Sequence, residues 1–424
     1  MLTLKTITEQ RDEVISRLAV KHFEATEYID RVIAMDATRR SAQTGLDKNL
    51  AEINNLSKQI GALMKTGKKE EAEAAKAKVA ELKESSKILD ETKTDAEKKI
   101  HELLLIIPNL PHISVPEGRS AEDNICEKMG GTLPTLSEDA LPHWELAKKY
   151  NLIDFELGVK ITGAGFPVYI GYGARLQRAL IDFFLDSARE AGYLEVQPPY
   201  VINADSGYAT GQLPDKEGQM YHCGLDDLYL IPTAEVPVTN LYRDMILEKT
   251  SLPVKNTAYS ACFRREAGSY GKDVRGLNRL HQFDKVEIVR IDTPEHSYQS
   301  LQEMVDYVES LVDRLELPWR ILRLCGGDMS FTSSLTFDFE VYSAAQKRWL
   351  EVSSVSNFES YQANRLKCRY RDENKKTQLC HTLNGSALAL PRIVAALLEN
   401  NQTPEGIRIP KALVPYTRFE VIYL

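Results

Sequence analysis

The chain has 424 residues, of which 43% are hydrophobic and 27% charged, and its formal net charge is −8 at pH 7. This length favours at least two globular domains, and the absence of a long apolar run or signal peptide predicts a cytoplasmic protein without a membrane partner. The acidic balance does not indicate a nucleic-acid partner, so any basic surface for one must be local.

A long helical hairpin is predicted near the N-terminus. Residues 26–105 contain no proline, and their apolar positions advance in alternating steps of three and four, which is the spacing of a coiled coil. Gly67 predicts a turn between two helices that then pack antiparallel, with a reach of roughly 55 Å at 1.5 Å per residue. Lysines and acidic residues balance along 65–102, as a solvated helix pair requires, so contact of the tip lysines with phosphates needs other support.

A second domain follows a linker at 106–118 that three prolines stiffen. Its pattern predicts an antiparallel sheet flanked by helices, and therefore an α+β protein overall. Helices are expected at 173–191, 294–315 and 386–399, and strands at 195–202, 258–263, 282–290, 320–325, 335–342 and 348–356. Neither the glycine pattern of dinucleotide-binding folds nor a P-loop is present.

The stretch 262–289 is the most informative part of the sequence, because it reads as two strands joined by a long polar loop. Charged residues end the first strand and continue through the loop: Arg264, Arg265, Glu266, Lys272, Arg275 and Arg279. Phe283, Lys285 and Glu287 share one face of the second strand. A strand-end arginine can bind a phosphate and an aromatic ring can stack on a base, which indicates a nucleotide site beside a basic loop. The alternative is a solvated hairpin with surface ion pairs.

Three further segments carry candidate binding groups. Thr233, Ala234 and Glu235 begin a predicted helix, where they either cap the helix or offer a carboxylate to a ligand ammonium. Residues 351–354, Glu-Val-Ser-Ser, are late in a strand. A carboxylate and a hydroxyl there could hold Mg²⁺, although a regular strand would place Glu351 and Ser354 on opposite faces.

Arg392 is a lone arginine on an otherwise apolar predicted helix that follows Ser386. Arginine in such surroundings needs a partner, either a phosphate or a buried carboxylate, and we favour the phosphate. Six cysteines form no Cys-x-x-Cys pair, so we expect free thiols and no structural zinc.

Taken in this order, the segments resemble the seryl-tRNA synthetases of the bacterial type, which are class II aminoacyl-tRNA synthetases. Residues 192–199 are similar to motif 1, the dimer element, residues 263–287 to motif 2, and residues 387–398 to motif 3. The resemblance implies a tRNA-binding helical arm at 1–108 and a catalytic domain at 109–424. It also implies a homodimer in which the arm of one subunit serves the site of the other. Pro391 departs from motif 3, where glycine often precedes the arginine, and leaves the start of that helix open.

The activity implied by this resemblance is serine–tRNA ligation: L-serine and ATP with Mg²⁺ form seryl-adenylate, and the seryl group passes to tRNA(Ser) and also tRNA(Sec). Arg264 and Arg392 would be catalytic, holding the α- and γ-phosphates. The implied ATP site consists of Arg264, Arg265, Glu266, Leu280, Phe283, Glu351, Val352, Ser353, Ser354 and Arg392, with Glu351 and Ser354 holding the metal. The implied serine site consists of Thr233, Ala234, Glu235, Glu287 and Ser386. The implied tRNA contacts are Lys65, Lys68, Lys69, Lys76, Lys272, Arg275 and Arg279.

Two other functions share part of this pattern. A ligase that loads an amino acid onto a carrier protein would lack the long arm at 26–105. A non-catalytic, synthetase-like RNA-binding protein would not need Arg264, Glu266, Glu351 and Arg392 together. A structural coiled-coil protein would leave residues 109–424 unexplained.

Overall fold

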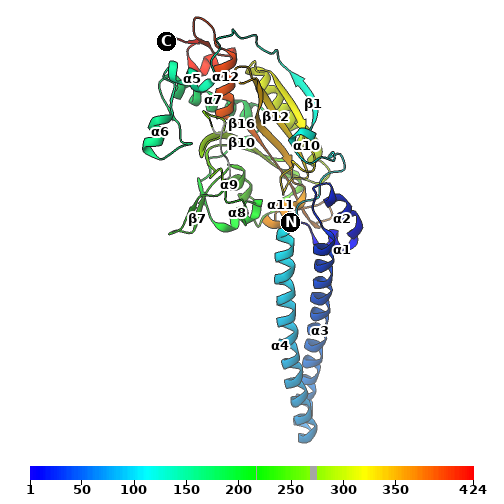
Figure 1. The fold of residues 1–424 in the computed structure, drawn as a ribbon. Coiled ribbons are helices and arrows are strands. Elements are labelled where there is room, and N and C mark those ends of the chain that lie inside the picture. The colour runs from blue at the N-terminus through cyan, green and yellow to red at the C-terminus, as the bar shows by residue number, and fades with distance from the viewer. Residues whose placement is uncertain (216, 268–274) are drawn as a thin grey trace. The chain divides into compact units, whose positions relative to one another are not determined.

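The computed structural model describes residues 1–215, 217–267 and 275–424, and the chain divides into two compact units, Met1–Leu110 and Pro111–Leu424 (Figure 1). The sequence predicts a division after residue 108, two residues earlier. Each unit has its own arrangement of helices or strands.

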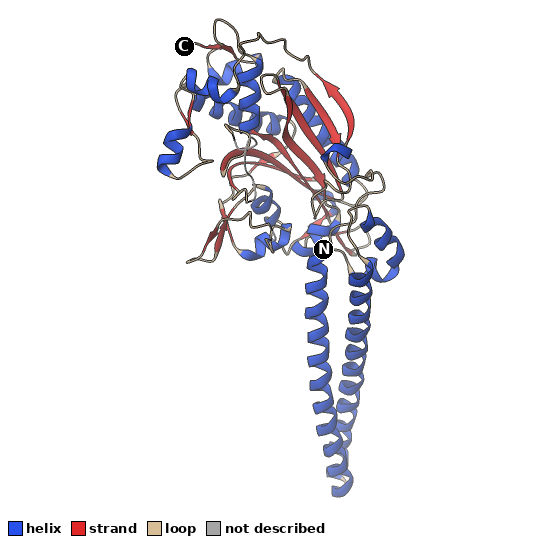
Figure 2. Ribbon diagram, in the orientation of Figure 1, coloured by secondary structure: helices blue, strands red, loops and turns tan. Residues whose placement is uncertain are grey.

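The first unit is helical (Figure 2). Two short helices, α1 (Leu4–Glu9) and α2 (Arg11–Ala19), precede the long helices α3 (Thr26–Lys65) and α4 (Lys69–Ile106), of 40 and 38 residues. The long helices pack antiparallel, as predicted, and Gly67 forms the turn with φ 78°. Ser86 interrupts the apolar stripe of α4, and the structure gives the reason: Asn49 Nδ2 of α3 donates to Ser86 Oγ at 3.2 Å.

The second unit is built on an eight-stranded sheet with the order β1-β11-β12-β13-β16-β10-β9-β4. Neighbouring strands are antiparallel except for the parallel pair β4 and β9 at one edge. The strands are β1 (Ile125–Gly130), β4 (Leu194–Glu195), β9 (Val254–Phe263), β10 (Gln282–Asp292), β11 (Trp319–Arg323), β12 (Leu335–Ser343), β13 (Arg348–Asn357) and β16 (His381–Ala389). The predicted antiparallel sheet is therefore confirmed.

Helices α7 (Tyr172–Glu190), α10 (Ser297–Arg314) and α12 (Leu390–Asn400) pack on this sheet through amphipathic faces. Shorter helices connect the strands: α5 (His143–Lys149), α6 (Phe155–Ile161), α8 (Ala204–Thr210), α9 (Glu235–Asn240), α11 (Ser360–Leu366) and α13 (Val414–Thr417). Small additional sheets contain β2 (Ile153–Asp154), β3 (Val168–Tyr169), β5 (Val201–Ile202), β6 (His222–Cys223), β7 (Leu228–Leu230), β8 (Ile246–Glu248), β14 (Arg369–Arg371), β15 (Thr377–Leu379), β17 (Ile407–Arg408) and β18 (Val421–Ile422).

Three predicted elements were wrong in their bounds. The strand expected at 258–263 begins four residues earlier, at Val254 of β9. The helix expected at 386–399 begins only at Leu390, because residues 386–389 extend β16 and Ser386 pairs with Glu287 of β10. Pro391 therefore falls in the first turn, where no intrahelical N–H bond is required. The strand expected at 195–202 is divided into β4 and β5, because the two prolines at 198 and 199 donate no ladder bonds.

Candidate active site

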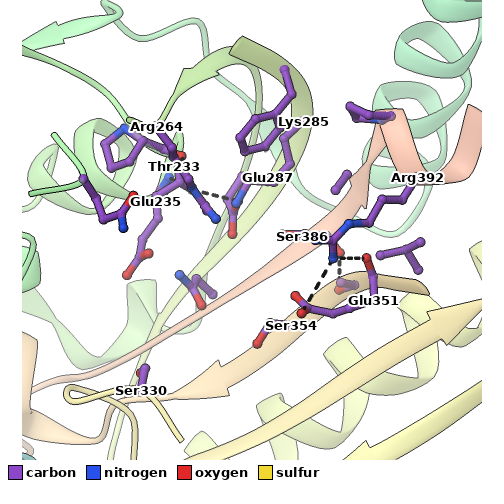
Figure 3. Close-up of a pocket in the computed structure, with 18 of the residues that line it drawn as sticks. Thr233, Glu235, Arg264, Lys285, Glu287, Ser330, Glu351, Ser354, Ser386 and Arg392 are labelled. Atoms are coloured by element: carbon purple, nitrogen blue, oxygen red, sulfur yellow. Dashed lines mark hydrogen bonds and ion pairs between the residues drawn. The ribbon is translucent and has the colours of Figure 1, made fainter. Parts of the chain in front are cut away.

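A cavity of about 610 Å³ opens over β13, β16 and β10, which are adjacent strands of the large sheet. Its lining brings together residues that are far apart in sequence, including both arginines singled out above, Arg264 and Arg392. Figure 3 shows two groups facing this space: one contains Thr233, Glu235, Arg264, Lys285 and Glu287, and the other contains Glu351, Ser354, Ser386 and Arg392. The cavity thus has one end rich in carboxylates and another with an arginine beside a carboxylate.

The first end contains three buried charged side chains. Glu287 of β10 forms an ion pair with Lys285, two residues earlier on the same strand, and accepts a hydrogen bond from Thr233 Oγ1 at 3.0 Å. In the described part of the chain, 1–215, 217–267 and 275–424, Glu235 has no cation as an ion-pair partner. Burial and the nearby Glu287 charge raise the pKa of Glu235 to about 7. An ammonium group bound next to this carboxylate would therefore stabilise its ionised form.

Gln362 of α11 fixes the orientation of Glu235. Its Nε2 donates to Glu235 Oε1 at 2.8 Å and to the Thr210 carbonyl at 3.1 Å, while its Oε1 accepts from Thr382 Oγ1 at 2.7 Å. No sequence pattern indicates a role for Gln362, because its partners come from three separate segments. Strand periodicity places Lys285 on the same face as Glu287, but it does not predict the ion pair between them.

Arg264 follows β9 and stands over the ring of Phe283, with its guanidinium carbon 5.2 Å from the ring centroid. Its Nε donates to the Pro232 carbonyl at 3.3 Å, and the residue lines the cavity, where its guanidinium group could bind an anion. Glu266 forms an ion pair with Arg279 at 3.2 Å, and both side chains line the cavity together with Leu280. Arg279, expected in contact with tRNA, is thus placed next to the nucleotide-binding candidates.

The opposite end is organised by Arg392 on α12. Its Nη1 donates to the Glu351 carbonyl at 2.7 Å and is 3.7 Å from Glu351 Oε2, while its Nε donates to the Asn278 carbonyl at 3.1 Å. Two backbone carbonyls therefore aim the guanidinium, and the carboxylate contact is long.

A β-bulge in β13 corrects the expectation that Glu351 and Ser354 face opposite sides. Glu351 pairs with Glu340 and Ser354 pairs with Asp338, so the register shifts by one residue and both side chains point to the same face. Ser353 also lines the cavity and donates to the Ser386 carbonyl at 2.5 Å.

The group around the bulge fits a hard divalent cation. Among the residues that the structure describes, the Oδ1 atom of Asp338 is buried without a hydrogen-bond partner. Burial and the Glu351 charge raise the pKa of Asp338 well above its usual value, against a hydrogen bond from Ser354. A cation would relieve this concentration of negative charge. Within residues 1–215, 217–267 and 275–424, no group of three or more His, Cys, Asp or Glu side chains is arranged to hold a metal, so phosphate oxygens would have to complete its coordination.

Comparison with known proteins identifies the family. Residues 1–111 match the model of the seryl-tRNA synthetase N-terminal domain, and residues 221–401 match that of the class II tRNA synthetase core domain (G, H, P, S and T). The chain is 54% identical to the serine–tRNA ligase of Salinibacter ruber, over 99% of this chain and 98% of that protein. The chain belongs to the seryl-tRNA synthetases. The serine–tRNA ligase of Akkermansia muciniphila is 47% identical, over 98% of this chain and 97% of the relative.

A solved structure of the family extends the similarity to three dimensions. The crystal structure of seryl-tRNA synthetase from Pyrococcus horikoshii complexed with ATP is 32% identical and superposes with a TM-score of 0.94, covering 100% of this chain and 99% of that one. The resemblance seen in the sequence and the class II fold are thereby confirmed. The match of residues 1–111 to the family's N-terminal domain argues against the carrier-protein ligase considered as an alternative.

Some residues expected in a seryl-tRNA synthetase site lie outside the cavity lining. Arg265 donates its backbone N–H to the Gln219 carbonyl at 2.9 Å, and Ala234 is the buried residue before α9. Arg275 is 3.4 Å from Glu145 and lies over the ring of Trp144. Lys272 lies outside the described residues. The tip lysines Lys65, Lys68, Lys69 and Lys76 are exposed on the helical unit, and their contact with RNA stays a prediction.

Proposed function

We propose that this protein joins L-serine to tRNA(Ser) with ATP, in two steps on the cavity described above. Full-length similarity to serine–tRNA ligases supports the class of reaction. The observation that carries the site assignment is the convergence of Arg264 and Arg392 on one cavity beside a carboxylate-rich pocket.

In the first step, a carboxylate oxygen of serine attacks the α-phosphorus of ATP, and the bond to pyrophosphate breaks. This chemistry depends on positioning and on neutralising charge rather than on a protein nucleophile. Arg264, close to the serine end, would stabilise the charge that develops on the α-phosphate. Arg392, at the other end of the cavity, would hold the γ-phosphate of a bent ATP. Phe283 and Glu266 lie on the Arg264 side, where an adenine ring could stack on Phe283 and donate a hydrogen bond from its amino group to Glu266.

Serine would bind among Thr233, Glu235, Glu287 and Ser386. Lys285 already neutralises Glu287, so Glu235 is the carboxylate with charge available for the substrate ammonium. The polar groups around the substrate hydroxyl would reject alanine by a factor of about 10⁴, since an analogue without the hydroxyl leaves them unpaired. Threonine would be excluded by size, worth about 1–3 kcal/mol per methyl group.

Glu351 and Ser354 would hold Mg²⁺, which would neutralise charge on the triphosphate when bound. The same-face arrangement created by the bulge supports this pair as ligands. Glu351 also contacts Arg392, so the metal ligands and the proposed γ-phosphate group lie next to each other.

In the second step, the terminal ribose hydroxyl of tRNA attacks the carbonyl carbon of the seryl group, and the bond to AMP breaks. The helical arm, predicted as residues 1–108, would bind the tRNA through the tip lysines, and Arg275, Arg279 and Lys272 would guide the acceptor end. The arm would act across a homodimer formed through the segment similar to motif 1, and tRNA(Sec) is a further expected substrate. A cytoplasmic location is expected; no helix in the described part of the chain is long and apolar enough to span a membrane.

Two assays separate the steps. Serine-dependent ATP–pyrophosphate exchange against a panel of amino acids reports adenylate formation, and charging of a tRNA with a long variable arm reports transfer. Exchange with another amino acid in preference to serine would refute the substrate. A variant lacking residues 1–108 should retain exchange and lose charging; full charging by this variant would reject the role of the arm.

A further inference from the structure

A buried polar cluster lies outside the cavity lining, next to the end of the cavity that contains Arg392. Its centre is Glu399 of α12, which accepts hydrogen bonds from the backbone N–H of His143 at 2.9 Å, from His143 Nδ1 at 2.8 Å, from Gln346 Nε2 at 2.9 Å and from Ser343 Oγ. The side chains of His143 and Glu399 are both 0% exposed. Burial alone would raise the pKa of Glu399, but the hydrogen bonds from His143 and Ser343 hold it below its usual value. The carboxylate is therefore an ionised acceptor at neutral pH.

The second nitrogen of His143 has a partner of its own. The backbone N–H of Leu277 donates to His143 Nε2 at 2.8 Å, so Nε2 is the acceptor and Nδ1 carries the hydrogen that is donated to Glu399. The carboxylate that accepts from Nδ1 thus fixes the tautomer and the orientation of the imidazole ring, as carboxylates do for histidines that ligate metals. Here the oriented nitrogen holds a backbone amide.

The cluster contacts four consecutive residues, 275–278. Gly276 has φ +65°, and a Cβ at this position would be 2.2 Å from His143 Nε2, so only glycine lets the backbone approach the imidazole this closely. Asn278 Nδ2 donates to Gln346 Oε1 at 3.1 Å. Arg275 places its guanidinium carbon 4.6 Å from the Trp144 ring centroid, on the residue next to His143.

These contacts lead directly to the proposed triphosphate site. Leu277 and Asn278 line the cavity, and the Asn278 carbonyl accepts the hydrogen bond from Arg392 Nε. Arg392 and Glu399 are seven residues apart on α12, so they lie on the same side of the helix, two turns apart. The segment 276–278 is therefore held at one point by His143 and at the next by Arg392.

We propose that His143 is a positioning residue for the nucleotide site, which holds Leu277 so that the carbonyl of Asn278 aims Arg392 at the triphosphate. This inference rests on the proposed function of the cavity as an ATP site. It assigns a role to a residue outside the segments similar to motifs 1, 2 and 3. It predicts a larger effect on ATP than on serine, because Thr233, Glu235 and Glu287 of the proposed serine pocket belong to the other group of cavity residues.

Two substitutions separate the contacts of His143. In His143→Asn the amide reaches only the position of Nδ1, so donation to Glu399 is retained and the acceptor for Leu277 is lost. In His143→Gln the amide oxygen reaches the position of Nε2 and can accept from Leu277. Ser343→Ala is the matched control, because it removes a hydrogen bond to Glu399 Oε2, whereas His143 donates to the other carboxylate oxygen, Oε1. Equilibrium binding of ATP and the KM values for ATP and serine in pyrophosphate exchange are measured for each folded variant.

We expect His143→Asn to weaken ATP binding about three- to tenfold, the factor that corresponds to one neutral hydrogen bond, with the KM for serine changed less than about twofold. His143→Gln should stay within about twofold of the wild type for ATP, and Ser343→Ala should lower Tm without changing ATP binding. Gly276→Ala, which drives a Cβ into the imidazole, should reproduce the effect of His143→Asn.

Equal ATP binding by the Asn and Gln variants, or parallel losses for ATP and serine, would assign the cluster to stability alone and overturn the proposal. The binding measurement does not require turnover. A wild-type protein that binds ATP but shows no serine-dependent exchange would therefore count against the proposed function, while the order of the variants would still decide the role of His143.

Discussion

The buried ion pair of Lys285 and Glu287 allows a direct test of how negative charge is neutralised in the proposed serine pocket. The two side chains are 7% and 2% exposed, so their charges are largely removed from water. Replacing Lys285 by Met would leave Glu287 with the hydrogen bond from Thr233 and no cation, next to the carboxylate of Glu235. Breaking a buried ion pair by removing one partner costs about 3–5 kcal/mol, because the remaining charge stays buried.

The double variant Lys285→Met, Glu287→Gln removes that remaining charge and provides the control. We expect thermal unfolding to give a markedly lower Tm for Lys285→Met than for the wild type, and a partial recovery of Tm in the double variant. The coupling between the two sites should exceed about 1 kcal/mol, as found for residues in direct contact. The single variant Glu287→Gln completes the comparison. A loss of stability in the double variant equal to the sum of the two single losses would show that they add, and would refute the neutralising role of Lys285.

Three further outcomes are expected from the geometry of the cavity. Arg264→Ala should abolish serine-dependent pyrophosphate exchange, and near-normal exchange by this variant would reject its assignment. Arg392→Ala should mainly raise the KM for ATP by roughly 10- to 100-fold, because it loses charged hydrogen bonds worth about 1.5–3 kcal/mol. The pKa of Glu235 is about 7 and its neutral form cannot pair with an ammonium, so the KM for serine should fall as pH rises from 6 to 8, and Glu235→Gln should remove this dependence. Ser354→Ala should raise the Mg²⁺ concentration needed for half-maximal exchange several-fold; an unchanged requirement would exclude Ser354 as a ligand.

Local periodicity predicted the parts of the fold in which neighbours in sequence decide the structure. The long helices of the first unit were readable because their apolar stripes and the Gly67 turn are local signals. The strand β16 was missed because most of its residues are buried, so that its sequence shows no alternation, and because its pairing with β10 is set by residues about a hundred positions away. Residues 387–389, Ala-Leu-Ala, are good helix formers that the sheet holds in a strand.

The resemblance to family motifs predicted which residues belong to the candidate site. Their arrangement in space came only from the structure. The bulge that turns Glu351 and Ser354 to one face depends on the register with β12, which no spacing within β13 indicates. The contacts of Gln362, Asn278 and His143 each join segments that are far apart in the chain. Such residues have no local pattern, because their chemistry exists only after the sheet has formed.

The hydrogen bond between Asn49 and Ser86 in the helical unit has a consequence for the length of that unit. A polar pair inside an apolar seam discourages the two helices from sliding past each other, since a displaced register would bury both groups against hydrocarbon. Slippage by one heptad would shift the end of the hairpin by about 10 Å, at 1.5 Å per residue. The pair therefore holds the two helices in one register. The lysines at the tip then stay at a constant distance along the hairpin from the ends of α3 and α4 that are opposite the turn.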